Sequence, residues 1–277
     1  GSVTHAAKVW LNGTLIAQHK GGFTPFEAEI TGLLAPGSTA LLTVACDNRV
    51  SHSTLPVGNE EGQLAFFGSD NAGIPSVEAA KRAAAPQNRP NFDFFNYAGI
   101  HRSVVLYTTP ADHIEDVTIV PELDGTVRYC VEHTGAAPVQ VTVRDAASRP
   151  VAQADGAEGT VKIQDVRLWE PKPGTPYLYT LHITCGADVY DQTFGVRTVE
   201  VKGTQVLLNG KPLYFKGFCK HEDFTAHGRG FDPVLNVKDV NLIHWANANA
   251  VRTSHYPYAE EFYDLCDREG ILVMDET

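Results

Sequence analysis

Short runs of alternating apolar and polar residues fill the first hundred positions, with Gly, Pro and Asn between the runs. Alternation with a period of two is typical of half-buried β-strands, and closely spaced turn residues favour a β-sandwich or jelly roll. The strands expected from this pattern are residues 7–11, 14–18, 40–46 and 102–107. Residues 1–108 are therefore predicted to form a jelly-roll β-sandwich that lacks its first strand or two.

A polar stretch with several Gly, Ala and Pro residues separates Pro56 from Pro90 and contains one helical pattern, at residues 76–85. A loop of this length inside a compact domain is uncommon and is often functional. A surface insertion without a function explains the stretch equally well. Its role therefore stays open at the level of sequence.

Residues 109–200 repeat the alternating pattern, with about ten residues from one strand to the next. The expected strands are 117–121, 126–132, 139–145, 160–164, 177–184 and 189–194. This spacing predicts an Ig-like β-sandwich. No cluster of reactive side chains occurs in it, and we interpret Trp169, which lies close to Pro171 and Pro173, as a packing residue. The module is expected to hold its neighbours in place.

After residue 200 the pattern changes to strands that alternate with helices. The expected elements are a hairpin at 205–208 and 212–215 around Asn209-Gly210, strands at 215–219, 250–253 and 271–274, and helices at 234–248 and 259–269. Strands separated by helices form parallel βαβ units with right-handed crossovers. Residues 201–277 are therefore predicted to form the first strands and helices of a β/α barrel.

Composition and charge say little about the fold, but they exclude some classes of binding partner. The chain is 43% apolar and 20% charged, and its formal net charge is −11. It has no basic stripe, which argues against nucleic acid or an anionic membrane surface as a partner. No apolar run approaches the ~18 residues of a membrane-spanning helix. Both a cytoplasmic and a secreted location remain open.

Five cysteines are present and none of them forms a CxxC pair. Cys130 and Cys185 lie on two expected strands of the same module. Alternation places Cys130 on the face of Arg128 and Glu132, whereas Cys185 lies on the apolar face of its own strand. A disulfide between them is therefore not expected, and all five cysteines are predicted to be free thiols.

Polar clusters follow each of the three expected barrel strands. His221 follows the first strand, His255 follows the second, and Asp275-Glu276 follow the third. In a β/α barrel the active site lies at the carboxyl-terminal ends of the strands. These side chains are therefore predicted to meet at one rim. The two histidines lack a metal-binding frame such as HExxH, so neither a metal nor a cofactor is expected.

Two carboxyl groups that act together on one bond, one as acid and one as nucleophile or base, must flank that bond at about 5 to 9.5 Å from each other. Asp275 and Glu276 are neighbours on a strand, so their side chains point to opposite faces. Glu222 and Asp223 are neighbours in the same way. No catalytic residue is therefore assigned within the chain.

Several segments carry a family resemblance. Residues 249–274 combine Asn, Arg, a His-Tyr-Pro triplet, Asp, Gly and four apolar residues in an order that resembles the first signature of glycoside hydrolase family 2. Residues 21–28 and 92–102 resemble the sugar-binding domain of the β-glucuronidase branch of that family. Residues 217–223 resemble the first barrel loop of the same branch. The resemblance covers nearly the whole chain.

The resemblance implies a jelly roll, an Ig-like β-sandwich and a TIM barrel, which together cleave β-D-glucuronides with retention. It places Asp93 and His255 in the substrate pocket. It assigns His221 to a sugar contact, by analogy with related β-galactosidases. It also places Arg252 near the nucleophile, where a guanidinium is well suited to a carboxylate. The branch further implies a homo-oligomer, namely a tetramer.

The acid/base and nucleophile glutamates of the family lie beyond Thr277, so this chain alone is expected to be inactive. Two other interpretations stay open: another family 2 activity, such as β-galactosidase or β-galacturonidase, and a non-catalytic carbohydrate-binding fragment. Two further glutamates at later strand ends would favour an enzyme. A downstream Asn-x-Lys would favour glucuronate as the sugar.

Overall fold

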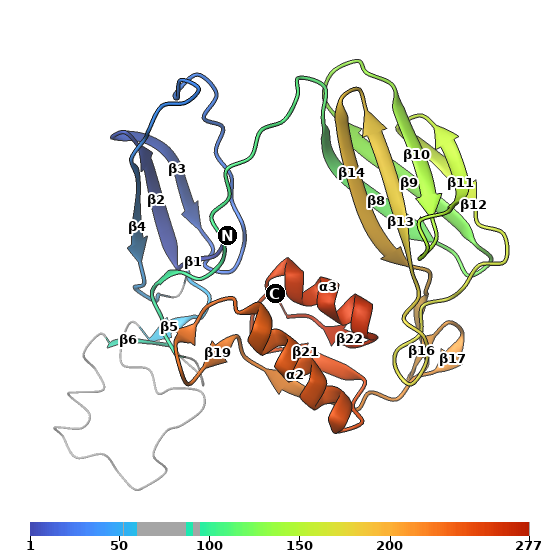
Figure 1. Ribbon diagram of the computed structural model, residues 1–277. Coiled ribbons are helices and arrows are strands. Elements are labelled where there is room, and N and C mark those ends of the chain that lie inside the picture. Colours follow the sequence, from blue (N-terminus) through green and yellow to red (C-terminus); the bar gives the residue numbers. More distant parts are fainter. Residues whose placement is uncertain (52, 60–86, 91–94, 277) are drawn as a thin grey trace, which may run out of the picture.

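The computed structural model describes residues 1–51, 53–59, 87–90 and 95–276. It consists of a small N-terminal sheet, a β-sandwich, and an α/β segment that lies between the lower ends of the other two parts (Figure 1). Strands make up most of the regular structure. Within these residues no helix is both long and apolar enough to span a membrane.

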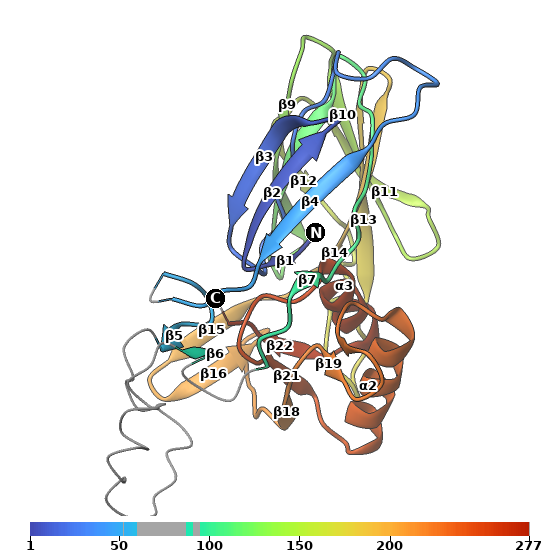
Figure 2. The ribbon, with the colours of Figure 1, turned by 90° about the vertical axis from the view of Figure 1, so that its left-hand side faces the viewer.

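The N-terminal sheet has three antiparallel strands in the order β3-β2-β4 (Figure 2). Ala7, Val9 and Leu11 alternate along the central strand and are buried, as the sequence predicts. Asn12 and Gly13 form the first turn, and their φ angles of 48° and 84° are those of a two-residue hairpin. The strands and the two short pairs beside them are β2 (Ala6–Leu11), β3 (Thr14–Lys20), β4 (Leu42–Asp47), β1 (Val3–Thr4) with β7 (Gly99–Ile100), and β5 (Gly58–Asn59) with β6 (Gln87–Pro90).

The strand expected at residues 102–107 does not form, so this prediction was wrong. The segment has no regular secondary structure, and no strand pairs with it in the part of the chain that the structure describes. Val105 and Leu106 are 71% and 75% exposed. Alternation indicates a strand only where a neighbour accepts its backbone hydrogen bonds. The helix expected at residues 76–85 lies outside the described residues.

The sandwich packs two antiparallel sheets, in the orders β11-β10-β13-β14 and β12-β9-β8. Val127, Val141, Leu181 and Ile183 lie in its core and are at most 1% exposed. All the expected strands form, and β11, whose residues are mostly small or polar, is additional. The strands are β8 (Ile114–Pro121), β9 (Thr126–His133), β10 (Val139–Arg144), β11 (Pro150–Asp155), β12 (Glu158–Lys162), β13 (Leu178–Cys185) and β14 (Asp188–Gly195).

All five cysteines are free thiols, as predicted. Cys130 is half-buried, and its Sγ lies 3.7 Å from Glu158 Oε1, on the face opposite the core. Cys185 is fully buried inside the sandwich. The two strands therefore place these thiols on different faces, which prevents a disulfide between them.

Buried thiols should resist alkylation in the native protein. Cys185 and Cys266 are at most 1% exposed, and burial raises the pKa of Cys266 to about 12. Because the thiolate is the nucleophile, we expect iodoacetamide to leave both unmodified at neutral pH and to label them only after unfolding. Peptide mapping by mass spectrometry measures this. A disulfide-linked peptide in the unreduced digest, or rapid native labelling of Cys266, would contradict it.

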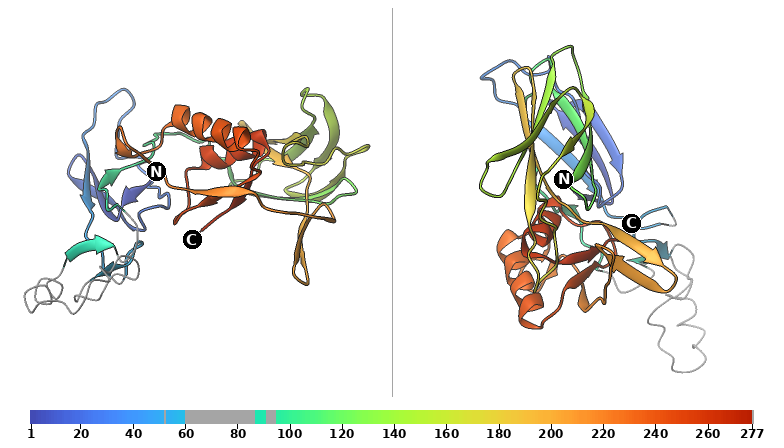
Figure 3. Two further views of the ribbon diagram at one scale, coloured as in Figure 1. Left: turned by 90° about the horizontal axis from the view of Figure 1, so that it is seen from below. Right: turned by 90° about the vertical axis from the view of Figure 1, so that its right-hand side faces the viewer.

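The C-terminal segment contains a parallel sheet in the order β18-β21-β22, and two helices cover the same face of it (Figure 3). Asp232 caps the first helix by accepting hydrogen bonds from the amides of Val234 and Leu235. Gly270, with φ 72°, ends the second helix. The elements are β18 (Gly217–Lys220), α2 (Pro233–Trp245), β21 (Ala250–Thr253), α3 (Glu260–Glu269) and β22 (Leu272–Met274).

Two smaller sheets accompany this segment. A hairpin sheet has the order β15-β16-β17, and a short antiparallel pair, β19-β20, follows β18 along the chain. Their strands are β15 (Val199–Lys202), β16 (Gln205–Leu208), β17 (Lys211–Pro212), β19 (Asp223–Phe224) and β20 (Gly228–Arg229). The hairpin turns at Asn209-Gly210, as expected, but its second strand is shorter than the predicted 212–215.

Trp169 joins the sandwich to the parallel sheet. It is 1% exposed and packs in one cluster with Leu208, Ala250 and Leu272. Its Nε1 donates a hydrogen bond to the carbonyl oxygen of Asp267 on α3, at 2.8 Å. This agrees with its interpretation as a packing residue. The contact fixes the sandwich at the amino-terminal ends of β21 and β22.

Candidate active site

The polar residues that follow the three parallel strands lie together at one rim. His221 directly follows β18, and Asp275-Glu276 directly follow β22. His255 is separated from the end of β21 by one residue, Ser254. The imidazole rings of His221 and His255 have centroids 5.3 Å apart, in a T-shaped arrangement. The predicted convergence of these strand ends is therefore confirmed.

Glu276 links the second and third strand ends. Its carboxylate pairs with the Arg252 guanidinium, and its Oε2 lies 3.0 Å from His255 Nδ1. The three side chains are between a quarter and about a third exposed, so the cluster is open to solvent. The hydrogen bonds that Arg252 donates to Cys219 Sγ and to the Glu276 carboxylate raise the pKa of its guanidinium, which stays charged. If Nδ1 of His255 donates to Glu276, Nε2 becomes the acceptor of that ring.

Asp275 has other partners than Glu276. Its Oδ1 accepts hydrogen bonds from Thr253 Oγ1 at 2.7 Å and from the Tyr263 hydroxyl at 2.6 Å. Burial and this hydrogen bond raise the pKa of Tyr263, so its hydroxyl stays protonated as the donor. Asp275 and Glu276 therefore bind different groups, and both lie just past the end of β22.

Aromatic rings bring the N-terminal module against the rim. Phe23, which is 3% exposed, stacks on the fully buried Tyr256 at a centroid distance of 4.1 Å. The Arg229 guanidinium lies 4.7 Å from the centre of the Tyr256 ring. Burial raises the pKa of Tyr256. Its neutral hydroxyl accepts a hydrogen bond from the backbone N–H of Glu222, at 2.9 Å.

The structure brings three of the four predicted site residues together: His221, His255 and Arg252. Asp93, the fourth, lies outside the described residues. Two further residues at this site were missed. Arg102 and Glu222 form an ion pair of 3.1 Å between side chains that are 12% and 8% exposed. They are 120 positions apart, so no local pattern in the sequence could link them.

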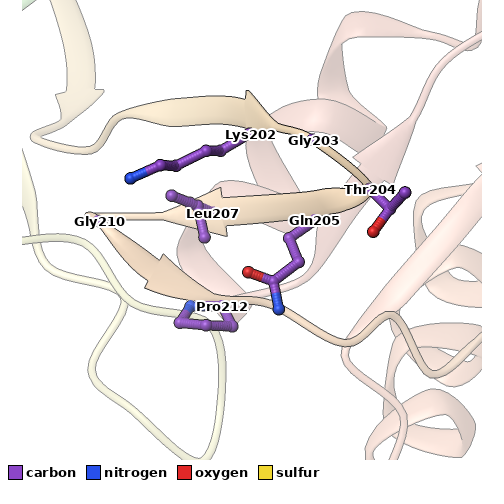
Figure 4. A pocket seen from close by; sticks show the side chains of 7 residues that line it. All are labelled: Lys202, Gly203, Thr204, Gln205, Leu207, Gly210 and Pro212. Carbon is purple, nitrogen blue, oxygen red and sulfur yellow. The ribbon is translucent and has the colours of Figure 1, made fainter.

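A hollow of about 560 Å³ lies elsewhere, over the open face of the hairpin sheet (Figure 4). Lys202, Gln205, Leu207 and Pro212 line it, with Lys202 as its one charged side chain. A single lysine beside apolar and amide groups provides neither an acid/base pair nor a nucleophile with a base.

Nowhere in the described ranges do three or more His, Cys, Asp or Glu side chains gather as they would around a metal ion.

Comparison with protein families matches the chain along nearly its whole length. Residues 1–110 match the sugar binding domain of glycosyl hydrolases family 2, residues 112–197 match the central model of that family, and residues 199–277 match its TIM barrel domain. The chain belongs to glycoside hydrolase family 2. The rim of His221, His255 and Arg252 lies in the part that matches the barrel of this family.

Several curated proteins that resemble the chain are named β-glucuronidases. The protein of Paenibacillus borealis is 43% identical over 100% of this chain and 46% of its own length. The Homo sapiens protein is 41% identical over 100% of the chain and 44% of its own length. The chain thus spans about half the length of the curated relatives that it matches.

Solved structures of family 2 members agree in fold. The Faecalibacterium prausnitzii β-glucuronidase is 86% identical, with a TM-score of 0.94 over 100% of this chain and 47% of that one. The Bifidobacterium dentium β-glucuronidase, solved with coumarin-3-O-glucuronide, is 51% identical, with a TM-score of 0.90 over 100% of this chain and 48% of that one.

Proposed function

We propose that this chain is part of a retaining β-glucuronidase that cleaves β-D-glucuronides. The observation that carries the proposal is the rim at which His221, His255 and Arg252 meet, in a chain whose similar relatives are named β-glucuronidases. In this proposal residues 1–108 form a jelly-roll sugar-binding module, 109–200 an Ig-like sandwich and 201–277 the start of a TIM barrel. The enzyme is proposed to be a homotetramer, which light scattering coupled to size-exclusion chromatography tests.

The residues at the rim have distinct proposed roles. His221 and His255 hydrogen-bond to sugar hydroxyls, for which imidazole has both a donor and an acceptor nitrogen. Arg252 holds carboxylate groups near the reacting carbon, with Glu276 already beside it. A guanidinium suits this task because its planar donors fit a carboxylate and it stays protonated.

The two catalytic carboxyl groups are proposed to come from outside these 277 residues. A retaining enzyme needs them about 5 to 5.5 Å apart on either side of the bond. Asp275 and Glu276 bind different partners, Thr253 and His255. Glu222 is buried and forms an ion pair with Arg102. None of these carboxylates is placed to act with another across a substrate.

Hydrolysis of a chromogenic β-D-glucuronide tests the proposal. We expect the intact enzyme to release the chromophore, and the purified 277-residue polypeptide to show no turnover above a blank prepared from a host without its own enzyme. The matching β-galactoside and β-galacturonide are the competing substrates. Faster hydrolysis of either one by the intact enzyme would assign a different family 2 activity. Turnover by the polypeptide alone would refute the placement of the carboxyl groups.

Substitution of Asp93 is a second test. The residue lies among aromatic neighbours in the sequence, which predicts a role other than solvation at the surface. A carboxylate that accepts hydrogen bonds from sugar hydroxyls contributes about 1.5–3 kcal/mol. Asp93→Ala in the intact enzyme is therefore expected to lower kcat/KM by at least about tenfold with an unchanged fold. Wild-type kinetics with a lower melting temperature would show that Asp93 only caps local backbone.

A further inference from the structure

We propose that Arg102 and Glu222 are positioning residues that set the distance between the two rim histidines. This inference rests on the proposed function, because it concerns the same site. Neither side chain needs to touch the sugar. They act through the loops that follow β18 and β21, which carry His221 and His255.

Arg102 joins three segments that are far apart in the sequence. Its Nη2 lies 3.1 Å from Glu222 Oε2 in the loop after β18, and 2.5 Å from the carbonyl oxygen of Pro257 in the loop after β21. Its Nη1 donates to the carbonyl oxygen of Phe23 in the N-terminal module, at 2.9 Å. The planar guanidinium fixes these acceptors relative to one another, which an ammonium on a flexible stem cannot do.

Glu222 extends the same connection to helix α3. The N-cap residue of α3, Ala259, has no side chain that can accept a hydrogen bond. Glu222 Oε1 accepts from the Ala259 N–H at 3.1 Å, which places a negative charge at the start of the helix. Both carboxylate oxygens therefore bind partners on segments other than their own.

Each rim histidine is adjacent in the sequence to a residue that takes part in these contacts. His221 precedes Glu222, and His255 precedes Tyr256, whose hydroxyl accepts from the Glu222 amide at 2.9 Å. The stacking of Tyr256 on Phe23 adds a contact to the N-terminal module. Loss of the Arg102 guanidinium releases both loops, and the histidines then lose their fixed separation. A sugar whose hydroxyls hydrogen-bond to both imidazole rings would then bind less tightly.

The test compares Arg102→Met with Arg197→Met in the intact enzyme. Arg197 also joins two modules, through an ion pair of 3.1 Å with Asp267, but it lies by Trp169 rather than at the rim. We expect Arg102→Met to raise KM for the chromogenic glucuronide at least fivefold. Glu222→Gln, which keeps an acceptor oxygen for Ala259, should have a smaller effect. Arg197→Met should leave KM within twofold of wild type.

A purely structural role gives a different result. If Arg102 only stabilised the fold, a smaller folded fraction would lower the apparent kcat and leave KM unchanged, and that outcome would overturn the proposal. Hydrogen–deuterium exchange provides a readout that does not depend on activity. Peptides covering residues 221–224 and 254–259 should exchange faster in Arg102→Met and not in Arg197→Met. Exchange unchanged in both loops would overturn the inference, whereas an inactive wild type would overturn the proposed function alone.

Discussion

Replacing Trp169 with alanine is expected to lower the free energy of unfolding by about 3–5 kcal/mol, the cost of removing a large buried aromatic side chain. The indole is 1% exposed and fills the junction between the sandwich and the parallel sheet. Its loss leaves a cavity there and removes the donor to the Asp267 carbonyl oxygen. Differential scanning calorimetry should show a decrease of about 6–20 °C in the melting temperature.

A second substitution at the same position separates packing from hydrogen bonding. Trp169→Phe keeps most of the apolar volume but has no N–H group, so the Asp267 carbonyl oxygen loses its donor. A buried acceptor left without a partner costs about 1–3 kcal/mol, so this variant should melt between wild type and Trp169→Ala. A melting temperature within about 2 °C of wild type for the alanine variant would mean that the junction does not depend on this residue.

Local patterns predicted the elements whose neighbours lie close in the sequence. The strand expected at 250–253 matches β21, and the helix expected at 259–269 matches α3 to within one residue. Helix α2 ends at Trp245, three residues before the expected end, because Asn247 adopts a left-handed φ of 55°. Periodicity alone does not show where a polar residue leaves the helical conformation.

Features that depend on distant partners could not be predicted in this way. Residues 102–107 alternate like a strand, yet in the described structure no neighbouring strand accepts their hydrogen bonds. Strand β11 pairs with β10 although its own residues give little apolar signal. The register of a strand with its neighbour and the exposure of its side chains depend on the tertiary structure. They override the intrinsic β-propensity of a short segment.

The candidate site shows the same division. The histidines were predictable because the ends of consecutive parallel strands meet at one edge. Arg102 and Glu222 were not, because their connection depends on how the N-terminal module packs against the loops after β18 and β21. A buried carboxylate after a strand looks in the sequence like any polar loop residue. Only its low exposure and its distant arginine distinguish it.

His255→Ala should cause the largest loss of activity among the described rim residues. The substitution removes the imidazole ring that we propose to bind the sugar. The same ring is the partner of Glu276, with Nδ1 at 3.0 Å from Glu276 Oε2. A hydrogen bond to a sugar hydroxyl contributes about 0.5–1.5 kcal/mol and one to a charged carboxylate about 1.5–3 kcal/mol, so the loss of both should lower kcat/KM for a β-D-glucuronide about 100-fold. Steady-state kinetics of the intact enzyme measure this. His255→Gln, which keeps a donor and an acceptor, should lose less.

His182 provides the matched control for this experiment. It also pairs with a carboxylate, its Nδ1 lying 2.6 Å from Asp191 Oδ1, but on neighbouring strands of the sandwich. His182→Ala removes a His–carboxylate pair of the same kind without touching the rim, so kcat/KM should stay within twofold of wild type. Equal losses from the two alanine variants would indicate a general effect on folding. Unchanged kinetics in His255→Ala would remove His255 from the substrate site, because a ring that binds the sugar cannot be deleted without cost to the transition state.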